Sequence, residues 1–226
     1  MKELSHLFAN NRVWADQIQT EDPEFFRKLC HQQAPRYFWI GCSDSRVPAN
    51  QITGLLPGEM FVHRNVANVV PPNDLNCLSA LQFAVDVLRV RHVIVCGHYG
   101  CAGISAVLNG LRLGLVDQWL MHVEKVRQKH SAQLASLGNE GKHFDRLCEL
   151  NVIEQVARVC ESTCVQDAWA RGQPVMVHGW IYAVNDGLLR DLGLCIADPE
   201  ELAPAYQAAI ASGSPFFNAA HGRLPS

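Results

Sequence analysis

Tyr37-Phe38-Trp39-Ile40-Gly41-Cys42 decides the fold of this 226-residue chain. A short apolar and aromatic run of this kind, ending at a glycine, is typical of a strand that is buried on both faces. A second buried strand is predicted over 92–96, and the segment 75–90 before it has apolar residues at helical spacing. A strand, a helix and a strand in this order pair in parallel through a right-handed crossover. We therefore expect an α/β fold with a mostly parallel central sheet flanked by helices.

The rest of the chain continues this pattern within a single domain, 1–226. We divide that domain into an N-terminal helical arm (1–34), an α/β core (35–196) and a C-terminal helical segment (197–226). The arm is expected to hold two helices and has little core of its own. The other expected elements are a strand at 60–63, helices at 103–109, 115–136 and 145–171, a strand at 175–182, a turn at 185–187, an edge strand at 188–196 and a last helix at 199–212.

Composition excludes several classes of protein. The net charge is −3 and charged residues make up 18% of the chain, so no basic face suggests a nucleic-acid partner. No stretch is apolar for the length of a membrane span, and residues 1–11 lack the pattern of a secretion signal. Nine cysteines form an odd set without the spacing of a secreted disulfide framework. We expect a cytoplasmic protein with most of its cysteines reduced and with no membrane partner.

Two segments carry chemistry, Cys42-Ser43-Asp44-Ser45-Arg46 and His98-Tyr99-Gly100-Cys101. Cys42, Asp44, His98 and Cys101 supply two thiolates, a carboxylate and an imidazole, a ligand set that suits tetrahedral Zn²⁺. Arg46 follows Asp44 by two residues and can hold it in a bidentate ion pair. The fourth metal position is therefore either filled by Asp44 or left open for water. Both segments fall just past the ends of predicted strands, where open α/β sheets place their ligand sites.

Plainer interpretations apply to the other candidate side chains. Free cysteines are often buried, so Cys77, Cys96 and Cys160 are expected in the core. His63, His92 and His178 are interpreted as packed or hydrogen-bonded residues. The glycine-rich stretch 97–103 lacks the spacing of a phosphate loop or a dinucleotide fingerprint. A lone His-x-x-Cys would be weak support for a metal site, and its combination with Cys-x-Asp-x-Arg makes the signal strong.

At these motifs the chain resembles the β-class carbonic anhydrases. The resemblance covers roughly 1–195 and also rests on the stretches 63–68, 97–103 and 178–180. It implies zinc bound by Cys42, His98 and Cys101, with a fourth place that alternates between water and Asp44. It further implies a homodimer, or a dimer of dimers, in which the N-terminal arm wraps the neighbouring protomer.

The activity implied by the resemblance is the reversible hydration of carbon dioxide to bicarbonate. Asp44, held by Arg46, would orient the attacking nucleophile as the catalytic pair. The substrate would lie in an apolar slot lined by Phe61, Val66 and Phe83, with Gln33 reaching it across the protomer interface. Phe83 departs from the tyrosine that is often found there in plant members, which removes a hydroxyl and keeps the apolar wall.

Trp39, Arg64 and Tyr182 resemble only the bacterial type II branch of the family. In that branch the matching positions bind a non-catalytic bicarbonate and stabilise an inactive state, so allosteric inhibition by bicarbonate and by low pH is expected. Two other functions stay open. The same scaffold could hydrolyse carbon disulfide or carbonyl sulfide, or the protein could bind zinc without catalysis if Asp44 never leaves the metal.

Overall fold

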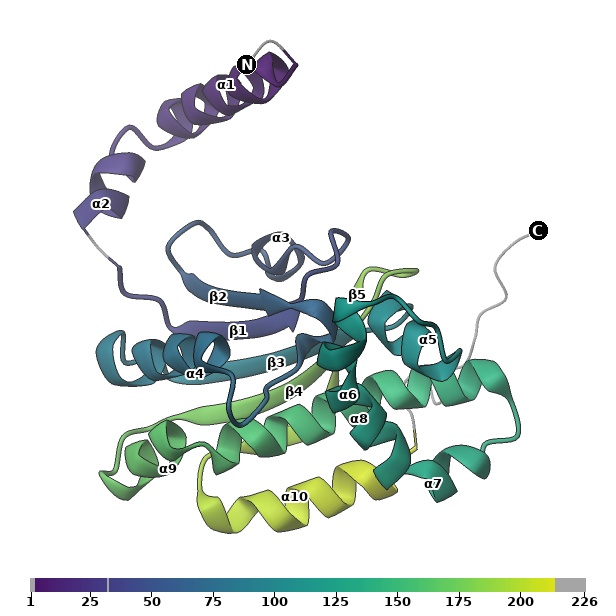
Figure 1. Cartoon of the computed structure of the whole chain (residues 1–226). Coiled ribbons are helices and arrows are strands. Elements are labelled where there is room, and N and C mark those ends of the chain that lie inside the picture. The colour runs from purple at the N-terminus through teal and green to yellow at the C-terminus, as the bar shows by residue number, and fades with distance from the viewer. Residues whose placement is uncertain (1–2, 32, 214–226) are drawn as a thin grey trace.

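A five-stranded sheet forms the centre of the computed structural model, which describes residues 3–31 and 33–213 (Figure 1). The strand order is β2-β1-β3-β4-β5, and all neighbours run in parallel except β4 and β5. The strands are β1 (Tyr37–Cys42), β2 (Met60–Asn65), β3 (His92–His98), β4 (Met176–Ala183) and β5 (Leu188–Ile196). The expected mostly parallel α/β architecture is confirmed, and β5 is the antiparallel edge.

Helices cover the two faces of the sheet unequally (Figure 1). Phe38 and Ile40 point into the larger core cluster, to which α4, α8 and α9 contribute. Trp39 points the other way, into a smaller cluster with Met60 and Ile94 beside α3. The helices of the body are α3 (Ala49–Thr53), α4 (Leu75–Gln82), α5 (Ala102–Leu108), α6 (Leu115–Lys129), α7 (Ser131–Ala135), α8 (Glu140–Glu161), α9 (Thr163–Ala170) and α10 (Pro199–Ala211), with a 3₁₀ turn at Val66–Asn68 and a π-helical turn at Phe83–Val87.

Helix α8 is the central helix of the body. Every residue from Arg146 to Val156 is buried, because α8 lies against β3 and β4 on one side and against α6 and α10 on the other. Its start is set by Asn139, whose side chain accepts hydrogen bonds from the amides of Gly141 and Lys142. Several polar side chains of α8 therefore point into the protein, and three of them, Glu149, Asn151 and Gln155, reach the loops around the candidate site.

The N-terminal arm projects from the body, with its first helix standing apart and Leu29 of its second helix lying beside Gly58 (Figure 1). It consists of α1 (Ser5–Glu21) and α2 (Phe25–His31), and neither helix has a buried residue. Trp14 packs edge-on against Phe26, so the two helices contact each other. The apolar residues Leu4, Leu7, Phe8, Val13 and Trp14 are exposed. The expectation of two arm helices without a core of their own is confirmed.

The structure corrects several element boundaries. The helix expected over 115–136 is divided at His130, and the one expected over 145–171 begins at Glu140 and is divided at Ser162. Ser162 has an extended backbone, with ψ of 141°, which no continuous helix can contain. The segment expected over 197–226 forms α10, and its residues 214–226 lie outside the described part. No helix among the described residues combines the length and the apolar character that a membrane span requires.

Candidate metal centre

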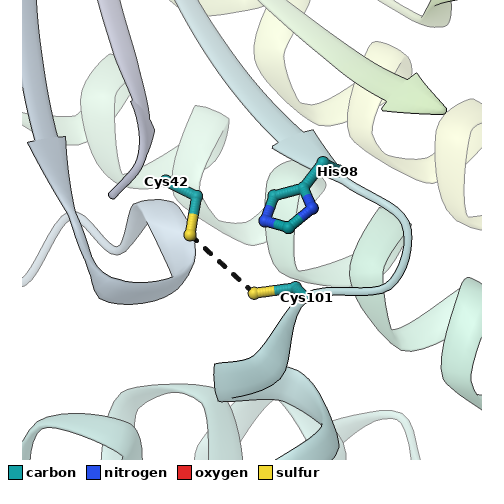
Figure 2. Close-up of side chains that lie close together, drawn as sticks. All are labelled: Cys42, His98 and Cys101. Atoms are coloured by element: carbon teal, nitrogen blue, oxygen red, sulfur yellow. Dashed lines mark hydrogen bonds between the residues drawn. The ribbon is translucent and has the colours of Figure 1, made fainter. Parts of the chain in front are cut away.

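Cys42, His98 and Cys101 meet at the carboxyl end of the sheet (Figure 2). Cys42 is the last residue of β1 and His98 the last of β3, and these two strands are neighbours. Cys101 is the residue directly before α5. One potential ligand atom from each residue lies within 4.8 Å of the others, and all three residues are buried. The structure thus brings together three of the four residues predicted as ligands, and Asp44 is the fourth.

The separation of the two sulfur atoms fits a shared metal ion. The Sγ atoms of Cys42 and Cys101 are 3.9 Å apart. Two thiolates bound to one tetrahedral Zn²⁺ at about 2.3 Å are separated by roughly 3.8 Å. A disulfide would require about 2.05 Å. The geometry of the pair therefore suits zinc without rearrangement of either side chain.

The imidazole of His98 is also oriented to bind a metal ion. Its Nδ1 lies 2.9 Å from the carbonyl oxygen of Tyr99, which accepts only if Nδ1 carries the proton. The other nitrogen, Nε2, is buried and has no hydrogen-bond partner among the described residues. A buried nitrogen with a free lone pair is unfavourable unless something binds it. A metal ion between Nε2 and the two sulfurs would satisfy it, and a carbonyl partner on the far nitrogen is a common feature of metal-bound histidine.

The surroundings of Cys42 favour its thiolate. The Cys101 thiol lowers the pKa of Cys42, and His98 and the backbone amides of Asp44 and Ala67 add to this effect, which outweighs the opposing influence of burial. The amide of Ala67 lies 3.4 Å from the Cys42 sulfur. Hydrogen bonding to Cys42 and burial raise the pKa of Cys101, which keeps the shared proton in the absence of a cation. A metal ion would replace that proton.

Asp44 is paired with Arg46 in this structure. Its Oδ1 accepts from the backbone amide and Nε of Arg46, each at 2.9 Å, and its Oδ2 accepts from Nη2 at 2.7 Å. Hydrogen bonds from Arg46 hold the pKa of Asp44 well below its usual range. Oδ2 lies 3.7 Å from Nε2 of His98, so the carboxylate borders the site. Arg46 also donates to the carbonyl oxygen of Gly100 at 3.1 Å, which ties both motifs together.

A strained turn supports the Cys42 side of the site. Ala67 has φ of 64° and Asn68 has φ of 47°, which non-glycine residues adopt at a cost. Asn151 of α8 donates to the carbonyl oxygen of Ala67 at 2.8 Å, and Gln155 accepts from the amide of Val70 at 2.9 Å. These contacts hold the turn so that the Ala67 amide points at the Cys42 sulfur. Sequence reasoning missed Asn151 and Gln155, because polar residues on a helix are normally read as its solvent face.

Three of the predicted substrate residues, Phe61, Val66 and Phe83, are apolar, and the fourth is Gln33. Phe61 lies between Phe38 and Phe83, with ring centroids 5.6 Å and 5.9 Å away. Val66 and Phe83 are partly exposed, at 38% and 42%. Gln33 is exposed and lies before the start of β1, whereas Cys42 is the last residue of that strand. Six strand residues span roughly 17 Å, so Gln33 is not brought to the metal ligands of its own chain.

The three residues predicted to bind bicarbonate lie on three strands, Trp39 on β1, Arg64 on β2 and Tyr182 on β4. Trp39 and Tyr182 both belong to the smaller core cluster, and the indole N–H of Trp39 lies over Gly41. That N–H is buried and has no hydrogen-bond partner among the described residues. Arg64 pairs with Gly41 across the two strands and donates to the carbonyl oxygens of Cys42, at 2.8 Å, and of Asp44. The histidines at 92 and 178 hydrogen-bond each other at 3.1 Å, away from the candidate metal ligands.

Comparison with known proteins agrees with this geometry. A family model described as carbonic anhydrase matches residues 37–189. The carbonic anhydrase of Emericella nidulans is 46% identical over 188 residues, which are 83% of this chain and 82% of that protein. The Coccomyxa β-carbonic anhydrase, solved with acetazolamide, superposes with a TM-score of 0.84 at 43% identity and covers 89% of this chain and 91% of its own. One of two tetrameric β-carbonic anhydrases from Sordaria macrospora gives 0.82 at 36% identity, with coverage of 87% and 100%. The chain therefore belongs to the carbonic anhydrase family, and to its β class of enzymes.

Proposed function

We propose that this protein catalyses the reversible hydration of carbon dioxide to bicarbonate and a proton, with one Zn²⁺ held by Cys42, His98 and Cys101. The observation that carries the proposal is the fit of these three side chains to one ion: two sulfurs 3.9 Å apart beside a buried nitrogen without a partner. Bound zinc supplies a Lewis acid that makes a nucleophile available from water near neutral pH. The residues around it orient that chemistry.

Asp44 and Arg46 form the proposed catalytic pair. Because Arg46 donates three hydrogen bonds to it, the carboxylate stays ionised and faces the space beside Nε2 of His98. In this position it accepts a hydrogen bond from the attacking water and orients a lone pair toward carbon dioxide. A protein that bound zinc without catalysis would have no use for this arrangement, since Asp44 would remain on the metal.

The substrate slot is proposed to be lined by Phe61, Val66 and Phe83. Val66 directly follows β2, whereas Phe61 is the second residue of β2 and packs against Phe83, so Val66 and the two phenylalanines are proposed to reach one slot from two protomers. These side chains would present an apolar wall, which suits a small molecule without charge. Gln33 is proposed to complete the slot from the neighbouring protomer, because within its own chain it lies beyond the opposite end of β1. The whole chain is taken as one domain whose arm docks on a second copy. The exposed apolar residues of α1, together with the tetrameric state named for the Sordaria relatives, support at least a homodimer.

Bicarbonate and low pH are proposed to restrain the enzyme through Trp39, Arg64 and Tyr182, as in the bacterial type II branch. The unpartnered N–H of Trp39 is a donor that an oxyanion could satisfy. Val47 packs in the same cluster as Trp39 and belongs to the loop that carries Asp44 and Arg46. An anion that displaced Val47 would move this loop and with it the catalytic pair. Low pH would act in the same direction, because it keeps the water at the metal centre protonated and so lowers the amount of nucleophile.

Metal analysis combined with a carbon dioxide hydration assay tests the main proposal. We expect about one zinc per chain in the wild type and a loss of both zinc and activity in Cys42→Ala. Cys195→Ala is the matched control, because Cys195 is exposed on β5. Full zinc content in Cys42→Ala would contradict the ligand set. A zinc-loaded wild type that hydrates no carbon dioxide but hydrolyses carbon disulfide or carbonyl sulfide would replace the proposed substrate.

The bicarbonate site has its own test. Trp39→Phe keeps the aromatic ring and removes the N–H, so added bicarbonate should inhibit this variant less than the wild type. Trp180→Phe is the control, since Trp180 contacts Trp39 edge-on in the same cluster. Equal inhibition of all three proteins would leave the active site as the place where bicarbonate acts.

A further inference from the structure

A buried ion pair connects helix α10 to the loop between His98 and Cys101. Arg146 and Glu149, both on α8, are 3% and 0% exposed, and Nη1 of Arg146 lies 2.9 Å from Oε2 of Glu149. Nη2 of Arg146 donates to the carbonyl oxygens of Ala209 and Ile210, in the last turn of α10. On the other side, the hydroxyl of Tyr99 donates to Oε1 of Glu149 at 2.5 Å. The pair therefore has a hydrogen-bonded partner at each end.

Tyr99 transmits this contact to a metal ligand through its backbone. Its carbonyl oxygen lies 2.9 Å from Nδ1 of His98, the contact that leaves Nε2 free for the metal. Its amide donates to the carbonyl oxygen of Tyr182 at 3.0 Å, which fixes the start of the loop to β4. With the side chain held by Glu149 and the preceding peptide group held by β4, Tyr99 has little freedom to turn the following peptide group, which carries its carbonyl oxygen. The direction of its carbonyl group decides where the His98 ring can settle.

Stability alone is a weak reason for this ion pair. Removing two charges from water costs about as much as pairing them returns, so apolar residues of similar size would stabilise the core as well. What an ion pair adds is direction, because carboxylate and guanidinium groups accept and donate at defined angles. Here Glu149 accepts from Tyr99, which lies between the proposed ligands His98 and Cys101 in sequence.

We propose that Tyr99, Glu149 and Arg146 are positioning residues that set the orientation of His98 and so the affinity of the metal centre. Through Arg146, the last turn of α10 takes part in holding the loop. None of the three touches the substrate or the metal. The inference rests on the zinc centre proposed above, and it concerns how tightly and in what geometry that centre binds its metal.

The first test compares two tyrosine variants. Tyr99→Phe removes the hydroxyl and keeps the ring. Tyr206→Phe removes the same kind of hydrogen bond, since Tyr206 of α10 donates to Glu154 of α8 at a place that contacts Lys129 and His130 instead of the metal loop. In competition with a chromophoric chelator, we expect Tyr99→Phe to bind Zn²⁺ about 10- to 100-fold more weakly than the wild type. Tyr206→Phe should stay within about twofold, even if both variants lose similar stability.

A spectroscopic readout separates positioning from general destabilisation. Cobalt(II) in place of zinc reports ligand geometry through its visible absorption, and we expect a changed spectrum only in Tyr99→Phe. Glu149→Gln keeps an oxygen that can accept from Tyr99, so it should show a smaller loss of affinity. The double variant should bind zinc about as weakly as Tyr99→Phe alone, because both changes interrupt one chain of contacts.

The outcomes distinguish the two proposals. A wild type that binds no zinc would refute the metal centre itself. A wild type that binds zinc, with Tyr99→Phe matching Tyr206→Phe in affinity and cobalt spectrum, would overturn the positioning role alone. Additive losses in the Tyr99→Phe/Glu149→Gln double variant would also overturn it.

Discussion

Replacing Gly97 with alanine should disturb the packing of β3 on α8, one residue before His98. A Cβ atom at this position would lie 2.5 Å from Cγ2 of Val152 and 3.5 Å from Oδ1 of Asn68. Contacts below 3.0 Å are not tolerated, so an atom must move. Val152 is fully buried and cannot turn toward solvent. Overpacking of this kind costs about 1–3 kcal/mol, and the lower backbone entropy of alanine in the unfolded chain returns roughly 0.5–1 kcal/mol. We expect a net loss of about 0–2.5 kcal/mol, centred near 1 kcal/mol.

A second substitution tests whether this contact is the cause. Val152→Ala alone removes two buried methyl groups, which costs about 1.6 kcal/mol in transfer free energy and somewhat more for the cavity. In the double variant the new methyl at position 97 enters the space that Val152 vacates. The double variant should therefore be at least about 1 kcal/mol more stable than the sum of the two single changes predicts.

Urea unfolding at fixed zinc and protein concentration is the assay, because bound metal and assembly both add to apparent stability. Gly97→Ala should also bind zinc more weakly than the wild type, and Val152→Ala should restore part of the affinity. Additivity of the two single changes within about 0.5 kcal/mol would refute the steric reasoning.

Three further predictions address other parts of the molecule. Gly41→Ala would place a Cβ 2.2 Å from the indole nitrogen of Trp39, so the indole must move. This displacement should relieve inhibition by bicarbonate without loss of zinc, and unchanged inhibition would argue against the proposed bicarbonate site. Burial raises the pKa of Glu154, but hydrogen bonds from His130, Tyr206 and Lys129 outweigh it and lower the pKa from 4.5 to about 2. Because the pKa of Glu154 is lower in the folded protein, its contribution to stability is complete above pH 4.5 and is lost as the pH falls toward 2. Glu154→Gln should therefore be less stable than the wild type at neutral pH and should lose less stability between pH 4.5 and 2. Urea midpoints of the two proteins that change in parallel with pH would contradict this. Phe8→Ser with Trp14→Ser should shift sedimentation toward the monomer, and an unchanged assembly would exclude a role of these residues in dimerisation.

The sheet and the metal ligands were predictable because local sequence determines them. The runs at 37–42 and 92–96 are apolar on both faces, and the structure buries both faces of these strands. Cysteine and histidine at the ends of two neighbouring parallel strands must then lie close together. Cys42 and His98 needed no tertiary information beyond strand order, and Cys101 follows His98 within one turn.

The supporting side chains could not be predicted in the same way. Residues of α8 from Arg146 to Val156 are buried all round, so the helix has no solvent face for a pattern to reveal. Glu149 and Asn151 look like surface residues in sequence, and only the packing of α6, α10 and the sheet around α8 turns them inward. The divisions at His130 and Ser162 were missed for a related reason, since neither interrupts the run of helix-forming residues with glycine or proline.

Helix α1 has a thermodynamic consequence. A 17-residue helix in water is only marginally stable by itself, and α1 buries no side chain against its own protomer. If a second protomer supplies its order, as proposed above, ordering of the arm and association of protomers become one linked equilibrium. Association would then release more heat and bury more apolar surface than the docking of two preformed bodies, with a correspondingly larger negative change in heat capacity. Dilution would reverse both events together, and the arm would lose its helical signal at the concentration at which the protomers part.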